Sequence, residues 1–338
     1  MGQISFFEHA DFLVHLNKHK DPLKKLDQAI NWKQFKAIID KKFRTERKSN
    51  AGRPPFDYIL MLKIIVLQSL YGLSDQQAEF QILDRYTFKR FLGIERDEQV
   101  PDEKTIWLFK ERLGEDGIRK IFDRFNTSLI GAGFTAKRGS MIDATFVDVP
   151  KQRNSRDEND QIKDNEPPED WPDEKRRQKD VDARWATKNK ETHFGYKNHV
   201  CADAKHKLIR EYSVTPASTH DSVEFDGMLK ACEKNSGKSV YADSAYISEE
   251  NVGKVKDRGL KCRIHEKGYR GHPLTAKQKK RNSSLSKTRC RIEHIFGRMA
   301  QCGADLIRCV GMRRAKRQIG IINLTYNMTR LAALGGRA

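Results

Sequence analysis

Residues Ser140-Met-Ile-Asp-Ala-Thr-Phe-Val-Asp-Val149 mark the point where helix-forming sequence gives way to sheet-forming sequence. Met141, Ile142 and Phe146 make this stretch short, apolar and partly β-branched, which favours a β-strand. Asp143 lies in its middle, where burial of a carboxylate is costly unless a partner compensates the lost hydration. A single aspartate in a strand is most often a surface residue, and the alternative is a metal ligand presented by a rigid strand. The rest of the chain decides between these two interpretations.

Length and composition narrow the class of protein. A chain of 338 residues predicts two or three domains. The longest apolar stretch, residues 59–67, is far shorter than the roughly 20 residues that span a bilayer, and the first residues do not resemble a secretion signal. We therefore expect a cytoplasmic protein without a membrane partner. The six cysteines form no Cys-x-x-Cys pair, and Cys262, His265 and His272 match no familiar zinc-ligand spacing, so reduced structural cysteines are expected.

Positive charge is concentrated in one segment. The net charge is +19, and residues 261–317 hold 17 basic residues against 3 acidic ones. A solvated basic surface is the usual explanation for such a run. A segment with so many basic and so few acidic residues, however, favours a polyanionic partner, most simply double-stranded DNA.

The first part of the chain is predicted to be helical. Residues 1–50 form a helical segment that ends in a basic joint around Gly52-Arg53-Pro54, which is either a linker or a minor-groove contact. Residues 51–137 show apolar stripes at helical spacing, with predicted helices at 58–70, 74–84, 87–92, from 101 onward and at 121–129. Several short helices with tight turns resemble a helix-turn-helix DNA-binding domain, and a bundle that only packs or dimerises is the alternative.

Residues 138–338 are predicted to form an α/β domain. The expected elements, after the strand at 140–149, are a hairpin (194–203 and 208–214), a helix (219–233), a strand (239–243), a helix (248–258), a strand (261–264), a loop to about 284 and helices at 285–301 and 314–333. This order gives a mixed sheet flanked by helices. Residues 150–190 hold 11 acidic and 11 basic residues with four prolines, so we expect a charged, solvated or partly disordered insertion there.

Three carboxylates in this domain form the candidate site. Asp243 ends a short predicted strand, and ligands of such sheets gather at the carboxyl ends of parallel strands. Glu293 shares residues 261–317 with only two other acids, Glu266 and Asp305. An ion pair with Arg289, four residues earlier, is the simplest explanation for Glu293. Together with Asp143, however, the set is a hard-oxygen site that suits Mg²⁺ or Mn²⁺, and two such ions promote phosphodiester displacement.

Several motifs resemble one known family. They are Met141-Ile-Asp-Ala-Thr, Gly195-Tyr-Lys-Asn-His, Thr215-Pro-Ala-Ser-Thr-His-Asp-Ser, Tyr241-Ala-Asp-Ser-Ala-Tyr and Arg291-Ile-Glu-His-Ile-Phe-Gly-Arg. The set resembles the DDE transposases of bacterial insertion sequences, in the group that contains the IS-five and IS-four families. The resemblance implies a ribonuclease-H-like catalytic domain with Asp143, Asp243 and Glu293 as catalytic metal ligands. It also implies metal-dependent cleavage at terminal inverted repeats, strand transfer into target DNA, and a homodimer that pairs two transposon ends on bacterial nucleoid DNA.

The expected DNA contacts are Arg289, Arg291, Arg298, Lys197, Lys287, Lys104 and Arg53. One departure from the family concerns a Tyr–Arg–Glu–Lys signature of some relatives, because Ser286 and Ala300 stand where the tyrosine and the lysine are expected. That departure leaves the handling of the transposon end open, including any hairpin step. Two further alternatives stay open at this point. They are a ribonuclease-H-like nuclease without strand transfer and a non-catalytic DNA-binding regulator.

Two smaller predictions complete the site. Asp221 is expected to cap the helix that follows it, and a role beside the active site is the alternative. Trp171 and Trp185, in the charged insertion, are expected to pack against the sheet, and stacking on an extruded base is the alternative.

Overall fold

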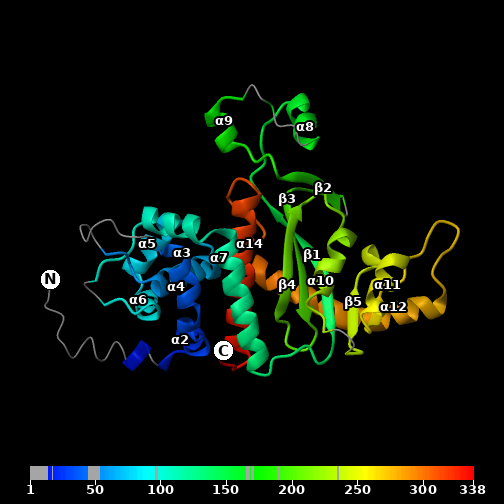
Figure 1. Cartoon of the computed structure of the whole chain (residues 1–338), viewed down its shortest axis with the longest axis horizontal. Coiled ribbons are helices and arrows are strands. Elements are labelled where there is room, and N and C mark those ends of the chain that lie inside the picture. Colours follow the sequence, from blue (N-terminus) through cyan, green and yellow to red (C-terminus); the bar gives the residue numbers. More distant parts are fainter. Residues whose placement is uncertain are drawn as a thin grey trace.

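A helical half and a sheet half share one long helix, α14 (Met312–Ala333), which lies between them (Figure 1). The computed structural model describes residues 14–16, 18–44, 54–95, 98–164, 168, 171–188, 190–233 and 236–338. One apolar core runs from the N-terminal helices through α14 to one face of the sheet. The three segments expected from the sequence, 1–50, 51–137 and 138–338, stay a prediction.

The helical half is built from short helices with recognisable ends. Its elements are α2 (Pro22–Ala29), η1 (Trp32–Phe35), α3 (Lys36–Phe43), α4 (Tyr58–Tyr71), α5 (Asp75–Asp84), α6 (Tyr86–Leu92) and α7 (Glu103–Gly131). Ser74 begins α5 with a capping box to Gln77, which agrees with the helix predicted at 74–84. The two helices expected from 101 and at 121–129 are one element, α7, which is interrupted only at Gly114, where the backbone has φ 63° and ψ −175°.

The sheet combines an antiparallel part with a parallel part. Its strands are β1 (Ser140–Asp148), β2 (Arg184–Lys188), β3 (Glu191–Asp203), β4 (Ile209–Pro216), β5 (Ser239–Ala242) and β6 (Lys261–Ile264). β1 and β4 are both antiparallel to β3, while β5 is parallel to β1, and β6 is parallel to β5. β2 pairs with the first residues of β3, beyond the segment that β4 covers.

Without β2, the spatial order is β4-β3-β1-β5-β6. In chain order this is third, second, first, fourth and fifth, with three antiparallel strands followed by two strands parallel to the first. This order is the ribonuclease-H-like arrangement, so the predicted fold class is confirmed. Helices cover both faces: α14 packs on the face of Met141, and α10 (Phe225–Leu229) and α11 (Glu249–Asp257) pack on the face of Ile142.

The charged insertion is more ordered than its composition suggested. Helices α8 (Arg156–Lys163) and α9 (Asp173–Gln178) form a lobe that projects beyond the sheet (Figure 1). Trp171 is 5% exposed, and its indole donates a 2.8 Å hydrogen bond to Glu158, which also accepts from Lys175. The hydrogen bond from Lys175, aided by those from the Ser155 backbone and Trp171, lowers the pKa of Glu158 to about 2. Among the described residues of the insertion, local ion pairs and one buried tryptophan hold two short helices together, while the prediction of a solvated or partly disordered insertion stays a prediction.

Helix boundaries near the site also differ from the prediction. The basic helix α12 (Ala276–Arg289) begins at a Thr275 capping box, where a loop was expected, and the 3₁₀ turn η4 (Cys290–Ile292) separates it from α13 (Glu293–Ala300). The predicted helix at 219–233 is only the 3₁₀ turn η2 (Asp221–Glu224) followed by α10. His220, and not Asp221, caps that turn through its side chain.

Among the described residues, no single helix is both long enough and apolar enough to cross a membrane. Helices α4 and α5 are long and apolar enough only when they are taken together, and the chain bends by 101° between them.

Candidate active site

Asp143 and Asp243 occupy equivalent positions on two neighbouring parallel strands. The pairing of β1 with β5 ends at Ile142 and Ala242, and the next residue of each strand is one of the two aspartates. Neighbouring strands lie about 4.8 Å apart, so the two carboxylates emerge side by side. Asp143 is 8% exposed, and its Oδ1 accepts a 2.9 Å hydrogen bond from the Ala144 amide.

Backbone geometry fixes Asp243 where the chain leaves β5. Its side chain caps the short turn η3 (Ser244–Tyr246) and accepts a 2.8 Å hydrogen bond from the Ala245 amide. A carboxylate held by the backbone at a strand end has few alternative rotamers, and its position is therefore set by the fold itself.

Glu293 is joined to this pair by Arg289. The guanidinium of Arg289 donates at 3.0 Å to Asp143 Oδ2 and at 2.8 Å to Glu293 Oε1. Arg289 ends α12 and Glu293 begins α13, so η4 sets their relative placement. The simple ion pair expected for Glu293 is therefore present, but it extends to the aspartate of β1. The Glu293 side chain is 57% exposed, whereas that of Asp143 is 12% exposed.

The electrostatics of the two aspartates differ. Burial raises the pKa of Asp143 to about 6, against the opposing charges of Arg289 and Lys188. Burial also acts on Asp243, but there the hydrogen bond from Ala245 and the same two cations hold the pKa below its ordinary value. Carboxyl groups with perturbed pKa values cluster at functional sites, so the opposite shifts of these two neighbouring acids make them candidate site residues.

The chemical type of the three candidate ligands suits a divalent cation. Three carboxylates are the hard oxygen ligands that Mg²⁺ and Mn²⁺ prefer. Among the residues that the structure describes, no three His, Cys, Asp or Glu side chains lie close enough to hold an ion as they stand. The guanidinium of Arg289 lies between two of the three acids. A zinc site at Cys262, His265 and His272 likewise has no support.

Four of the expected DNA contacts lie on the same helical segment as Glu293: Lys287, Arg289, Arg291 and Arg298. Lys287 and Arg298 are exposed, and Arg298 donates to Gln301 at 3.2 Å. Arg291 is half-buried and reaches the turn between β3 and β4.

The other expected DNA contacts lie elsewhere. The Lys197 ammonium donates to Thr219 O at 2.7 Å and to Asp221 at 2.8 Å, so an internal carboxylate already engages it. Lys104 is exposed in the first turn of α7, remote in sequence from the acids. Arg53 lies outside the described residues. As DNA contacts, all three stay predictions.

Two residues near the acids were missed by sequence reasoning. Lys188 ends β2, and its charge lowers the pKa of both aspartates. His265 follows β6, donates its amide to Ala242 O at 3.1 Å and lies near Arg289 and Asp243, whose charges act on its pKa. The rule that sites gather at strand carboxyl ends could have found His265. Nothing in the sequence marked Lys188, because its segment was expected to be partly disordered.

The two tryptophans of the insertion behave differently. Trp185 on β2 packs on Phe194 of the sheet with ring centroids 4.8 Å apart, as expected, and stays 43% exposed. Trp171 packs inside the α8–α9 lobe instead of against the sheet. Its burial leaves no free ring face for an extruded base.

Comparison with known proteins gives the family. Residues 135–328 match the family model described as a Transposase DDE domain, and residues 11–112 match one described as a Transposase domain (DUF772). The first match covers more than half of the chain, and the protein therefore belongs to the DDE transposase family. It is an enzyme of the DDE transposase type, and membership implies use of a divalent metal ion.

Solved structures with a similar chain are transposase complexes. One is the cryo-EM structure of a piggyBac transposase synaptic complex with hairpin DNA, at 11% identity and a TM-score of 0.48, covering 93% of this chain and 75% of that one. Another is the crystal structure of a pre-cleavage Mos1 transpososome, at 12% identity and a TM-score of 0.28, covering 88% and 84%. Similarity at these identities and TM-scores gives no evidence for the fold beyond the strand order described above.

Proposed function

We propose that this transposase binds the terminal inverted repeats of its own element, cuts DNA there and joins the cut ends to target DNA at one site. The proposal is supported by the position of Asp143 and Asp243 after the last paired residues of β1 and β5, and by Arg289, which links Asp143 to Glu293 of α13. Such a set on a ribonuclease-H-like sheet suits phosphodiester chemistry, and the basic segment around Glu293 suits its polyanionic substrate.

Two divalent ions, Mg²⁺ or Mn²⁺, held by these carboxylates would activate the attacking oxygen and stabilise the leaving one. Asp143 and Asp243 supply two fixed oxygen ligands, because strand pairing and backbone hydrogen bonds hold them. Glu293 supplies the third from a more exposed position.

Arg289 neutralises Asp143 and Glu293 in the protein alone. A DNA phosphate offers a guanidinium the same two-oxygen acceptor as a carboxylate. We infer that Arg289 turns from the acids to a phosphate when DNA binds, which frees the carboxylates and places the phosphate beside them.

The partner is double-stranded DNA at transposon ends and at the target, within the bacterial cytoplasm and nucleoid. Pairing of two ends calls for a homodimer. The contacts proposed nearest the cleaved bond are Arg289, Arg291, Arg298 and Lys287, and those proposed farther away are Lys197, Lys104 and Arg53.

A plasmid that carries the DNA flanking this gene on both sides tests the proposal. With Mg²⁺, the wild-type protein should release the element and produce joined products. Asp143→Asn and Asp243→Asn should each lower cleavage by at least about 1,000-fold, comparable to losing a key catalytic charge contact, while binding the same DNA. Cleavage without joined products would identify a nuclease, and binding without cleavage by the wild type would identify a regulator. Substantial cleavage by either variant would contradict the assignment of the acids.

A further inference from the structure

The turn between β3 and β4 is unusually well fixed. The buried carboxylate of Asp203 accepts hydrogen bonds from the amides of Lys205 at 2.7 Å and His206 at 3.1 Å, and from the His206 ring at 2.7 Å. Lys207 donates its amide to Asp203 O at 2.9 Å and has a φ of 60°, a left-handed conformation that side chains other than glycine rarely adopt. The backbone of residues 203–207 therefore has one defined shape.

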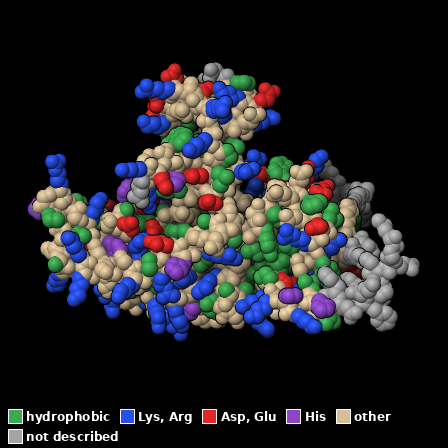
Figure 2. Space-filling view, turned by 180° about the vertical axis from the view of Figure 1, so that it is seen from behind, with side chains coloured by type: hydrophobic (Ala, Val, Ile, Leu, Met, Phe, Trp, Pro, Cys, Tyr) green, Lys and Arg blue, Asp and Glu red, His purple; other side chains and the backbone are tan. Residues whose placement is uncertain are grey.

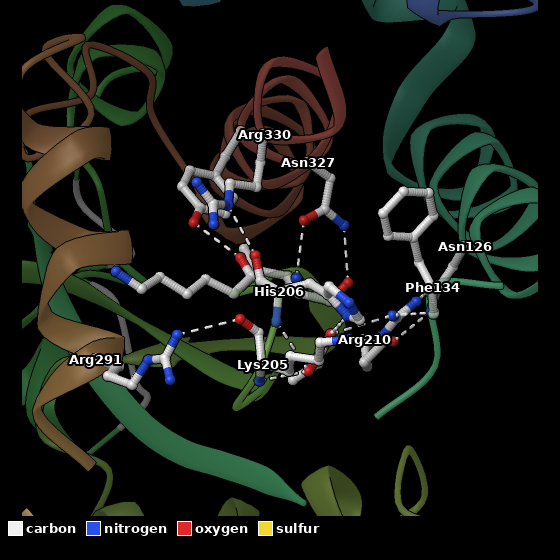
Figure 3. Close-up of polar contacts among 12 residues, drawn as sticks. Asn126, Phe134, Lys205, His206, Arg210, Arg291, Asn327 and Arg330 are labelled. Carbon is white, nitrogen blue, oxygen red and sulfur yellow. Dashed lines mark hydrogen bonds and ion pairs between the residues drawn. The ribbon is translucent and has the colours of Figure 1, made fainter. Parts of the chain in front are cut away.

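Side chains from two other elements hold the outward carbonyls of this turn. Arg291 donates to Lys205 O at 3.1 Å, Arg330 of α14 donates to His206 O at 2.7 Å, and Tyr326 donates to Lys207 O at 2.8 Å. Figure 3 shows Arg291 reaching the turn from one side and Arg330 reaching it from α14. Two guanidinium groups, those of Arg291 and Arg330, thus hold adjacent carbonyls of a turn that itself carries Lys205 and Lys207.

These cations have little opposing charge. None of the four forms an ion pair with a carboxylate within the described residues. Asp203 is fully buried beneath them and is already shared by His206 and Arg210. The Lys207 ammonium lies 3.1 Å from His294 Nδ1, and burial, together with the charges of Arg291 and Arg330, lowers the pKa of Lys207. A built cluster of unneutralised cations is a site for an anion.

We propose that Lys205, Lys207, Arg291 and Arg330 bind a backbone phosphate of the DNA strand that enters the active site, an inference that rests on the proposed function. Ser140, three residues before Asp143, pairs with Asp203. The turn therefore lies about 10 Å along the strand from Asp143. That separation corresponds to about three base-pair rises of 3.4 Å. A phosphate held there fixes the register of the strand on the three acids.

The position of Arg291 links the two sites. Arg291 and Glu293 are separated by one residue, and Arg289 and Glu293 face the acids while Arg291 and His294 face the turn. Figure 2 shows many Lys and Arg side chains along the lower edge of the molecule. Structural support of the turn does not account for all of these charges, since neither ammonium contacts the turn carbonyls and each guanidinium has further donors.

Lys207→Gly is the most informative variant. Glycine removes the cation and suits a φ of 60°, so the variant should unfold at the same temperature as the wild type or a higher one. Lys205→Gln removes the neighbouring charge from an exposed position. Lys256→Gln, on exposed surface of α11, is the matched control for the loss of one lysine.

Binding of a fluorescent duplex carrying the element's end, measured by anisotropy across a salt series, gives the readout. Each lost phosphate contact should lower the slope of log K against log salt by about 0.9. Because the four cations share one phosphate, the Lys205→Gln/Lys207→Gly double variant should lose up to about 0.9 units of slope, with roughly tenfold loss of affinity at low salt. Lys256→Gln should match the wild type. An unchanged slope and affinity in the folded double variant would overturn the proposal.

Lysine acylation read by mass spectrometry provides a second measurement. DNA should protect Lys205 and Lys207 from the reagent and leave Lys256 reactive, and equal reactivity with and without DNA would contradict the proposal. Millimolar inorganic phosphate distinguishes a free anion from DNA: phosphate-dependent thermal stabilisation lost in Lys207→Gly, with no change in the DNA slope, would overturn the DNA assignment. A wild-type protein that binds no duplex at all would instead reject the proposed function together with this site.

Discussion

The segment 276–300 and helix α14 are neighbouring C-terminal elements with opposite designs. α14 is continuous, and more than half of its residues are buried between the helical half and the sheet. Segment 276–300 is broken by a 3₁₀ turn, and of its residues only Leu285, Ile292, Ile295 and Met299 are buried. The buried helix packs against both halves, and the exposed, broken segment carries charges that we propose contact DNA.

Polar residues show the same division. In α14 the buried Asn323 exchanges two hydrogen bonds with Asn198 of β3, at 2.9 and 3.1 Å. In segment 276–300, Arg289 and Glu293 are paired with each other across the candidate site. A change in α14 should therefore cost stability, and a change in segment 276–300 should cost activity.

The largest stability effect is expected in α14. Asn323→Ala removes one partner of a fully buried amide pair and leaves the Asn198 amide unsatisfied, which should lower the free energy of unfolding by about 2–3 kcal/mol. Chemical denaturation measures it. The double variant with Asn198→Ala should be less destabilised than the sum of the single variants, and strict additivity would contradict a direct pair.

The free energy of unfolding should depend on pH because of His199, a histidine in strand β3 of the sheet. His199 is fully buried, and burial lowers its pKa from 6.5 to about 4. The folded state keeps the ring neutral, whereas the unfolded chain takes up a proton as the pH falls below about 6.5. The free energy of unfolding should therefore be highest above about pH 6.5. It should fall by about 2–3 kcal/mol as the pH is lowered to 4.

Denaturation of the wild type and His199→Gln across this pH range isolates the contribution of the ring from that of other titrating groups. The glutamine amide can replace the 2.8 Å hydrogen bond to Thr215 without titrating. Parallel pH curves for the two proteins would refute the role of His199.

The smallest changes in stability are expected from replacing one glycine in each helix, Gly320 of α14 and Gly297 of α13. A Cβ on Gly320 of α14 would lie 2.7 Å from Tyr212 Oη and 2.8 Å from Ile118 Cγ2, whereas a Cβ on Gly297 of α13 would meet nothing within 4 Å. Gly320→Ala should therefore destabilise the fold by about 1–2 kcal/mol through overpacking. Gly297→Ala should stabilise it by about 0.5–1 kcal/mol through helix propensity. Melting temperatures that move in the same direction would contradict the comparison.

The same contrast explains what the sequence could predict. α14 was predicted within two residues at its start, because buried apolar residues recur at helical spacing along residues 314–333. The start of α12 was missed because Leu285 is its only buried residue, so no apolar stripe marks the helix. A Thr275-x-x-Gln278 capping box was the one local signal.

The sequence likewise predicted some residues of the candidate site and missed others. Asp143, Asp243 and Glu293 were identified from strand ends, charge context and family motifs. The bridge through Arg289 to Asp143 spans residues 146 apart in the chain, and sequence patterns do not report such contacts. Lys188 and the cluster at the β3–β4 turn were missed for the same reason, since their neighbours come from β2, η4 and α14.

Glu293 and Glu266 offer the most direct test of the central claim. Both are glutamates of the basic segment, and each pairs with an arginine at 2.8 Å: Glu293 with Arg289 and Glu266 with Arg281. If Glu293 is a catalytic metal ligand, Glu293→Gln should abolish Mg²⁺-dependent release of the element from a plasmid. Glu266→Gln should cut as the wild type does, and both variants should stay folded. Equal cleavage by the two variants would show that Glu293 serves only its ion pair, and would contradict the account.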